Sequence, residues 1–515
     1  MGEGIVYLVG AGPGDPGCLT LRGKECLERA DVVVYDYLAN ADLLQHAPAR
    51  AERVFAGKHG AGPHLLEQTE INALLVERAR AGLTVVRLKG GDPLVFGRGG
   101  EEAEALLAAG LRFEIVPGVT SALAAPAYAG IPVTHRDWVS GVTVLTGHES
   151  PGKADARVRW DQLATAGNTL VLLMGLTQLR SNLESLLAAG LAPGTPAAAI
   201  RWASTPRQRV VEGTAGSLTE LVAAQRLRPP VTVVIGDVVS LRGRMRWFED
   251  RPLFGRRILV TRTRAQASRF SRLLGEQGAD VVECPVIEVR RLASPELEAA
   301  LERLDSYQWI VLTSANGVEV FFDRLLASGR DLRVLHGARI AAIGTETARS
   351  LEERHLKPDL VPDDFRAEGL LEAMAGYDLK GARVLLPRAA GARAVLPDGL
   401  RSRGADVDEV QTYESVAPIE GTERLRAVLE DGPLDCLTFT SSSTVTSFLG
   451  LLDRADEKEG RKRVAEARVA CIGPITAQTA REAGLRVDVM PKEYTIPALA
   501  AAVVESFRRG EQEEA

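Results

Sequence analysis

Residues 6–36 read VYLVGAGPGDPGCLTLRGKECLERADVVVYD, and this stretch decides the fold of the first half of the chain. Residues 6–9 are a short apolar run with β-branched members, which predicts a buried strand. A cluster of Gly, Pro and Asp then predicts a loop, and the apolar spacing after Thr20 predicts a helix. A second buried strand is expected at residues 32–35. The stretch therefore predicts a βαβ unit with a glycine loop at its first turn.

The glycine loop at residues 10–16 is expected at the carboxyl end of a strand, where open α/β sheets bind ligands. Its glycines allow the backbone to approach a ligand closely. A dinucleotide fingerprint needs glycine at the sixth position of G-x-G-x-x-G, but Asp15 stands there and Pro13 removes an amide donor. The loop favours a ligand with an adenosine and no phosphate over NAD, and a purely structural turn stays open.

Length and composition are those of a soluble protein. The 515 residues suggest roughly three or four folding units, and 45% hydrophobic and 25% charged residues are ordinary globular values. No apolar run approaches the roughly 20 residues that cross a bilayer, and the first residues lack a secretory signal, so we expect a cytoplasmic protein without membrane contact. A net charge of -6 argues against a nucleic-acid partner, because phosphate backbones need contiguous cationic patches.

The metal-binding residue types show no site pattern. Five cysteines are widely spread without a C-x-x-C pair, so neither disulfides nor a zinc site is expected. The closest histidines, His59 and His64, are more simply loop residues in solvent than metal ligands. We therefore expect no metal.

Four further motifs follow the glycine loop: GGDP at residues 90–93, FGRGGEE at 96–102, VPGVTS at 116–121 and GIPVTHR at 130–136. With the loop, they resemble the uroporphyrinogen-III C-methyltransferases of the tetrapyrrole methylase family over about residues 4–246. The resemblance implies a methyltransferase domain at residues 1–246, with α/β lobes at about 1–117 and 118–246. It also implies S-adenosylmethionine as cofactor, and we expect a homodimer through this half.

The resemblance implies roles for individual residues. Asp36 and Lys58 match the positions to which the family assigns proton acceptor and donor, although each could be a solvated surface charge. Arg22, Arg98 and Arg136 could bind substrate carboxylates. By the family's pattern, the residues that line the cofactor are Pro13, Gly90, Gly91, Asp92, Val95, Thr120, Ser121, Met174 and Ala203.

The charge of the cofactor agrees with the residue types in the two glycine turns. The sulfur of S-adenosylmethionine is cationic, and such a group suits carbonyl groups and carboxylates. Asp15 lies in the first turn and Asp92 in the second. Both turns are expected at carboxyl ends of strands, so they should face one crevice.

A linker is expected at residues 247–255, where the helix and strand periodicity stops. Its aromatic residues suggest that it packs on another part of the chain. Strand and turn signals restart at residue 256, so a cut within the linker should give two soluble halves. In the second half, four turns each follow a predicted strand and open a helix, at residues 313–317, 344–348, 440–443 and 473–477. Their hydroxyls and helix N-terminal amides suit carboxylates, although N-capping explains each turn alone.

Residues 256–515 resemble uroporphyrinogen-III synthase through ILVTR at 258–262, FTSS at 439–442, Tyr413 and CIGPITA at 471–477. The resemblance implies two α/β lobes, at about 256–290 plus 417–510 and at 291–416. We expect the phenol of Tyr413 to donate a hydrogen bond to the departing hydroxyl of hydroxymethylbilane. The alternative is a packed ring whose hydroxyl meets water. Thr440, Ser441 and Thr476 are expected to bind substrate.

Together the resemblances imply a bifunctional α/β enzyme of tetrapyrrole biosynthesis. The second half would cyclise hydroxymethylbilane to uroporphyrinogen III with inversion of ring D. The first half would methylate that small-molecule product at C2 and C7 with S-adenosylmethionine, giving precorrin-2 for sirohaem, cobalamin or haem d1. The alternative is a tetrapyrrole- or nucleotide-binding protein without turnover in one half.

Overall fold

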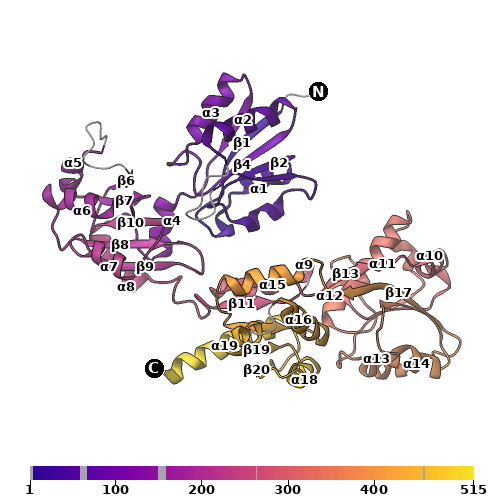
Figure 1. The fold of residues 1–515 in the computed structure, drawn as a ribbon. Helices are drawn as coiled ribbons and strands as arrows, with labels where there is room; N and C mark the ends of the chain where they lie inside the picture. Colours follow the sequence, from indigo (N-terminus) through magenta and orange to yellow (C-terminus); the bar gives the residue numbers. More distant parts are fainter. Residues whose placement is uncertain (1–3, 58–65, 149–157, 263, 456–458, 515) are drawn as a thin grey trace. The chain divides into compact units, whose positions relative to one another are not determined.

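The computed structural model describes residues 4–57, 66–148, 158–262, 264–455 and 459–514. Lys58, His59 and His64 lie outside these ranges. The chain divides into two compact units, Met1–Arg256 with Gln277–Asp280 and Arg257–Glu276 with Val281–Ala515. The described residues form four five-stranded sheets with helices packed on them (Figure 1), so the expected α/β class is confirmed.

The first sheet has the strand order β3-β2-β4-β1-β5 and is parallel throughout. The predicted βαβ unit is present, with β4 between its two strands. Because all five strands run the same way, the turns after β1 and β4 lie at one edge of the sheet. The elements are β1 (Ile5–Gly10), α1 (Leu21–Glu28), β2 (Val32–Tyr35), β3 (Glu52–Phe55), α2 (Gln68–Arg80), β4 (Thr84–Lys89), α3 (Gly99–Ala108) and β5 (Arg112–Val116).

The second sheet has the order β6-β7-β10-β8-β9, and within it only β6 and β7 pair in parallel. One of its faces packs on α4, where the small residues Ala122 and Ala125, with Ala129 just after the helix, permit a close approach. The other face packs on the helices α5 to α7. The elements are α4 (Ser121–Tyr128), β6 (Val142–Thr146), α5 (Trp160–Thr165), β7 (Thr169–Leu173), α6 (Leu179–Ala188), β8 (Pro196–Arg201), β9 (Arg209–Thr214), α7 (Leu218–Ala224), β10 (Val231–Ile235) and α8 (Arg242–Met245).

The linker that follows α8 packs on α4. The ring of Phe248 is buried and meets the ring of Tyr128 edge to face at a centroid distance of 4.9 Å. Trp247 lies 5.3 Å from the same ring, and its Nε1 donates a hydrogen bond to the carbonyl of Ala127 at 3.0 Å. The expectation that the linker aromatics pack on another part of the chain is thus correct, and that part is α4.

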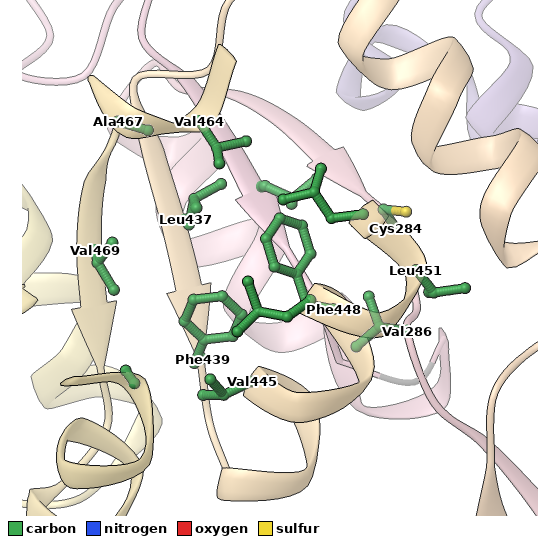
Figure 2. Close-up of a cluster of buried hydrophobic side chains, with 14 of the residues drawn as sticks. Cys284, Val286, Leu437, Phe439, Val445, Phe448, Leu451, Val464, Ala467 and Val469 are labelled. Carbon is green, nitrogen blue, oxygen red and sulfur yellow. The ribbon is translucent and has the colours of Figure 1, made fainter. Parts of the chain in front are cut away.

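The second unit contains a sheet of order β12-β11-β18-β19-β20, in which β11, β18, β19 and β20 run parallel. Its core holds the rings of Phe439 and Phe448, whose centroids are 5.5 Å apart, beside Cys284 (Figure 2). Burial raises the pKa of Cys284 and of Cys471 to about 11. The elements are β11 (Arg257–Val260), α9 (Arg264–Glu276), β12 (Asp280–Glu283), α15 (Gly421–Glu430), β18 (Cys436–Phe439), α16 (Ser442–Ala455), α17 (Gly460–Ala465), β19 (Arg468–Cys471), α18 (Pro474–Glu482), β20 (Val487–Val489) and α19 (Ile496–Glu514).

The other sheet of the second unit has the order β13-β17-β16-β14-β15. Its first strand, β13, begins at Glu288, so the lobe boundary predicted at residue 290 falls inside this strand. The antiparallel partner of β13 is the long strand β17, which also pairs in parallel with β16. The elements are β13 (Glu288–Arg291), α10 (Pro295–Glu302), β14 (Trp309–Leu312), α11 (Ala315–Ala327), β15 (Arg339–Ala342), α12 (Thr345–Glu352), α13 (Ala367–Ala373), β16 (Arg383–Ala389), α14 (Val395–Ser402) and β17 (Asp406–Val416).

The packing of the linker predicts where the chain tolerates a cut. A first fragment that ends at Gly255 keeps Trp247 and Phe248, and we expect it to be soluble and to unfold cooperatively. A fragment that ends at Met245 exposes the face of α4 that these rings cover, so it should melt at lower temperature and bind a hydrophobic dye. Circular dichroism melts of both fragments measure this. Equal melting temperatures would contradict a structural role of the linker.

Candidate active sites

The turns after β1 and β4 are hydrogen-bonded to each other. The amide of Gly12 donates to the carbonyl of Gly91 at 3.2 Å, and the amide of Gly91 donates to the carbonyl of Gly12 at 2.7 Å. Gly12 and Gly91 have φ values of +78° and +68°, a backbone conformation that residues other than glycine rarely adopt. The two glycine turns predicted to face one crevice therefore lie side by side.

The segment after β5, which contains Gly118, approaches both turns so closely that side chains on its glycine and on Gly10 would not fit. A Cβ built on Gly10 would lie 2.5 Å from the Cα of Gly118, and one built on Gly118 would lie 2.3 Å from the carbonyl oxygen of Gly91. At Gly91, a Cβ would meet nothing nearer than the amide of Ser121 at 3.7 Å and the Cα of Thr120 at 3.8 Å. A ligand can thus approach the backbone beside Gly91, toward the N-terminus of α4.

The carboxylate of Asp92 holds this arrangement. Its Oδ1 accepts from the amides of Leu94 (2.8 Å) and Val95 (3.2 Å), and its Oδ2 accepts from the amide of Gly118 at 3.0 Å. In the first turn, Asp15 accepts from the amide of Gly17 and from the hydroxyl of Tyr128, both at 2.7 Å. Both carboxylates expected to face a cationic sulfur are therefore already bound by protein donors, and their first role is to fix the turns.

Two further predicted cofactor residues, Ala203 and Met174, come from the second sheet. The carbonyl oxygen of Ala203 lies 3.3 Å from where a Cβ of Gly14 would stand, so Ala203 borders the loop that contains Pro13. Met174 follows β7 with a φ of +56°, and Trp202 beside Ala203 has a φ of +48°. Such strained residues often lie at functional sites.

A groove of about 430 Å³ brings two of the predicted residues together. Arg98 and Met174 line it together with Leu94, Phe96 and Thr146. The guanidinium of Arg98 is bound by the carboxylate of Glu101, with distances of 2.9 and 2.7 Å. An exposed pair of this kind contributes only about 0 to 1 kcal/mol, so an anionic ligand can displace it.

The other two predicted arginines lie in different surroundings. The guanidinium of Arg22 is held by Glu114 on β5 at 2.9 and 2.8 Å, and by Glu25 at 3.1 Å. Arg136 is exposed, in a turn that backbone hydrogen bonds between His135 and Val139 close. Arg22 also lies over the ring of Tyr7, with its Cζ 5.7 Å from the ring centroid. Its described hydrogen bonds are all with protein carboxylates, so a substrate would have to replace one of them.

Asp36 follows β2 and is positioned by fixed donors. Its Oδ1 accepts from the amides of Leu38 and Ala39 at 3.1 and 3.2 Å, and its Oδ2 lies 3.5 Å from the guanidinium of Arg87. Its side chain is 25% exposed, so a proton from a ligand can reach it. Lys58, the predicted proton donor, lies outside the described residues.

Behind Asp36 lies a buried cluster of charges that was not predicted from the sequence. Arg87 and Lys89 of β4 both bind Oε1 of Glu102 in α3, at 3.1 and 2.7 Å, and Gln68 donates to the same oxygen at 3.2 Å. Glu102 is completely buried, and among the described residues its Oε2 has no hydrogen-bond partner. Burial, and next the charge of Arg87, lower the pKa of Lys89. The sequence did contain a signal for this cluster, because Arg87 and Lys89 stand in the otherwise apolar strand VVRLK and buried charges need partners.

Tyr413 lies in β17 with only 5% of its surface exposed. Its hydroxyl is 2.7 Å from Oγ of Ser314, which caps α11 by accepting from the amide of Gly317 at 2.9 Å. Burial raises the pKa of Tyr413, although the hydrogen bond to Ser314 and the charge of Arg388 oppose this. The phenol is therefore neutral at pH 7, and its ring packs while its hydroxyl meets Oγ of Ser314.

The four predicted turns of the second half each open a helix. Each of the two sheets has one turn with a serine cap and one turn with a glycine before the helix. Ser314 precedes α11 and Ser441 precedes α16, and each hydroxyl accepts an amide of its helix. Gly344 and Gly473 precede α12 and α18 without a side-chain cap. Thr440 is half-buried beside Ser441, and Thr476 is buried in the first turn of α18.

Two aromatic residues next to these turns were not predicted. The ring of Phe365 lies 3.2 Å from an ideal Cβ of Gly344, and the ring of Tyr494 lies 3.3 Å from that of Gly473. Both rings are partly exposed. The two aromatic residues occupy the same position in two similar segments, DDFRAEGL at residues 363–370 and KEYTIPAL at 492–499. Comparing these segments within the sequence would have indicated that the two lobes share this arrangement.

Comparisons with known proteins show the family of each half of the chain. The model of the tetrapyrrole (corrin/porphyrin) methylases matches residues 5–219, and that of uroporphyrinogen-III synthase HemD matches residues 268–501. A protein of Ruminiclostridium josui named porphyrin biosynthesis protein HemD is 38% identical over 96% of this chain and 96% of its own length. The chain belongs to both families, joined end to end.

Shorter proteins match the methylase half. An S-adenosyl-L-methionine-dependent uroporphyrinogen III methyltransferase of Methanosarcina barkeri is 51% identical over 46% of this chain and 93% of its own length. The crystal structure of a uroporphyrin-III C-methyl transferase from Thermus thermophilus, complexed with S-adenyl homocysteine, shares 41% identity and a TM-score of 0.40, covering 46% of this chain and 99% of that chain. Both family resemblances expected from the sequence are confirmed.

Among the described residues, neither a membrane-spanning helix nor a metal-binding cluster is present. None of the described helices combines the length and apolar character that crossing a bilayer requires. Within the same ranges, no three His, Cys, Asp or Glu side chains gather as metal ligands would.

The buried charges of the methylase half predict that two neighbouring glutamates differ strongly in their contribution to the free energy of unfolding. Glu102→Gln leaves Arg87 and Lys89 buried without their anion, so it should lower the free energy of unfolding by about 3 to 5 kcal/mol. The matched control Glu101→Gln breaks only the exposed pair with Arg98 and should cost about 0 to 1 kcal/mol. Urea unfolding monitored by circular dichroism measures both. Similar losses in the two variants would show that the cluster contributes no special stability.

Proposed function

We infer that the protein is a bifunctional enzyme of tetrapyrrole biosynthesis. Its synthase half cyclises hydroxymethylbilane to uroporphyrinogen III, and its methylase half converts that product to precorrin-2 with S-adenosylmethionine. One observation carries this inference: a single chain holds a member of each family, and the product of one reaction is the substrate of the other.

In the methylase half, the backbone beside Gly91 supports a cofactor site. The residues fit S-adenosylmethionine, because a side chain at Gly91 would fill the space toward Thr120 and Ser121. We propose that the further residues lining this site are Pro13, Gly90, Val95, Met174 and Ala203. The cofactor supplies a methyl group to a pyrrole carbon, and the chain must align the two reactants.

Asp36 is the proposed proton acceptor. Methylation of a pyrrole carbon leaves a proton that must be removed, and a carboxylate fixed by two amides and by Arg87 can take it. The substrate carries carboxylates, for which Arg98 in the groove is the best-placed partner of the three proposed arginines. Lys58 stays the proposed proton donor.

In the synthase half, Tyr413 is the proposed hydrogen-bond donor to the departing hydroxyl. Oγ of Ser314 accepts the amide of Gly317, so its own proton can be given to the oxygen of Tyr413. The phenol proton is then available to the substrate, where a hydrogen bond would stabilise the charge that develops on the leaving oxygen. The uncapped amides of α12 and α18, with the hydroxyls of Thr440, Ser441 and Thr476, suit the carboxylates of the bilane.

We also propose a cytoplasmic protein that acts on small tetrapyrroles without a nucleic-acid partner and forms a homodimer through its methylase half. The net charge of -6 supports the absence of a nucleic-acid surface. Light scattering of the eluting protein tests the dimer, which should have about twice the chain mass of 55.2 kDa. A monomer at micromolar concentration would contradict it.

The whole reaction can be tested with the intact protein. Incubation with hydroxymethylbilane alone should give uroporphyrinogen III, and addition of S-adenosylmethionine should give its dimethylated product. Chromatography and mass analysis separate the isomers and the methylated species. Binding of substrates without turnover in one half would favour the alternative of a binding module. Formation of only the spontaneous type I isomer would contradict the synthase assignment.

Asp36→Asn should slow methylation of uroporphyrinogen III by roughly 10² to 10⁴, the usual effect of a lost general base. Asparagine keeps the size of the side chain and an oxygen for the amides of Leu38 and Ala39, so affinity for S-adenosylmethionine should persist. The rate of the synthase half in the same preparation is the internal control. Unchanged methylation would remove Asp36 from the reaction.

Tyr413→Phe should slow formation of the type III isomer several-fold or more, while the type I isomer accumulates by spontaneous closure. The phenylalanine keeps the packed ring and removes only the donor. The matched control is Tyr377→Phe, a tyrosine of the same sheet region whose ring packs on Trp309 at 4.9 Å. Equal rates and isomer ratios in all three proteins, measured after oxidation to porphyrins, would make Tyr413 a packing residue.

A further inference from the structure

We propose that the linker is a working part of the methylase cofactor site, in which Trp247 and Phe248 hold Tyr128 and Tyr128 positions the glycine loop through Asp15. The inference rests on the proposed function of the methylase half and adds positioning residues to it. The linker lies beyond residues 5–219, which the methylase family model matches. Two chains of contacts support the proposal.

The first chain of contacts begins at the loop. The hydroxyl of Tyr128 donates to Oδ2 of Asp15 at 2.7 Å, and Oδ1 of the same carboxylate accepts from the amide of Gly17 at 2.7 Å. Sγ of Cys18 lies 3.5 Å from that hydroxyl. Burial raises the pKa of Tyr128 strongly, so the phenol keeps its proton. A hydrogen bond to a carboxylate is about twice as strong as one between neutral groups, so Tyr128 fixes the loop firmly.

Two rings of the linker contact the ring of Tyr128. Phe248 and Trp247 have centroids 4.9 and 5.3 Å from that of Tyr128, and Phe254 packs against Phe248 at 5.5 Å. The guanidinium of Arg251 lies over Trp247 and over Phe248, at 4.9 and 4.8 Å from the ring centroids. These contacts fix both linker rings, so the ring of Tyr128 has little freedom to move.

The second chain of contacts runs through polar groups. Glu249 of the linker is paired with the buried Arg242, which also donates to the carbonyl of Ala129 at 2.6 Å. The other oxygen of Glu249 accepts from Nε2 of Gln208 at 3.0 Å. Oε1 of Gln208 accepts from the amide of Ser204 at 3.0 Å. The linker is thereby connected to the segment that follows β8.

Ser204 closes the second chain at the loop. Its Oγ accepts from the amide of Asp15 at 3.1 Å, and Asn40 donates to the carbonyl of Gly14 at 2.7 Å. Nε2 of Gln208 also donates to the carbonyl of Tyr128 at 3.2 Å, which joins the two chains of contacts. Both routes therefore end on Asp15, one on its side chain and one on its backbone.

The arrangement predicts that linker substitutions change cofactor affinity without touching the cofactor. A loop that is no longer fixed must be ordered when the ligand binds, and that ordering weakens binding. The loss should fall on the KM for S-adenosylmethionine, whereas kcat and the KM for uroporphyrinogen III should stay near their original values. The synthase half of the same chain should be unaffected, because Tyr128 and the linker aromatics belong to the other unit.

The test uses the full chain and three variants. Tyr128→Phe removes the hydroxyl and keeps the ring, Trp247→Ala removes a supporting ring, and Arg246→Ala, immediately before the linker, is the matched control. Arg246 forms only an exposed pair with Asp250 among the described contacts. Calorimetric titration with S-adenosylhomocysteine gives the affinity, and steady-state assays give both KM values.

We expect Tyr128→Phe to weaken binding by several-fold, up to the roughly hundredfold that a hydrogen bond to a charged group can contribute. Trp247→Ala should also weaken it, and Arg246→Ala should not. Tyr128→Phe keeps the packing, so it decides the matter if Trp247→Ala does not fold. Native affinity in a folded Tyr128→Phe protein overturns the inference. If the unsubstituted protein itself fails to bind S-adenosylhomocysteine, the proposed function of the methylase half is what fails.

Discussion

The reciprocal hydrogen bonds between Gly12 and Gly91 are the constraint on which the methylase half depends. They bring the ends of β1 and β4 together, and the approach is possible only because Gly10 and Gly118 carry no side chains. Asp92 then ties the segment after β5 to the same place through the amide of Gly118. The proposed cofactor site is therefore built mostly of backbone, which explains why glycine and proline dominate its motifs.

The buried charges of Arg87, Lys89 and Glu102 support the same site from within the core of the first sheet. Lys89 immediately precedes the second glycine turn, and Arg87 contacts the proposed base Asp36. Because both cations share one buried oxygen of Glu102, the base and the turn are fixed by a single anion on α3. In the proposed arrangement, the linker stabilises the first turn through Tyr128. The two turns thus have separate supports, one of ion pairs and one of aromatic rings.

The sequence predicted the parts of this account that depend on local chemistry. Apolar runs gave β1 and β2, and glycine clusters gave the turns, because both signals lie within a few residues. Long-range contacts could not be predicted in this way. Glu101 and Glu102 are adjacent and look alike in sequence, yet one is half exposed and the other completely buried. Likewise, Tyr128 sits in an alanine-rich helix, and only the folded chain shows that Asp15 and Phe248 meet it.

The central claim is that the backbone beside Gly91 receives the cofactor, and calorimetric titration with S-adenosylhomocysteine tests it most directly. Gly91→Val should abolish binding, because the side chain enters the space toward Thr120 and Ser121. The control Gly110→Val imposes the same backbone strain, since Gly110 has a φ of +70°, but a Cβ there has nothing within 4 Å. We predict native affinity in Gly110→Val and none in a folded Gly91→Val protein. Native affinity in Gly91→Val would contradict the account.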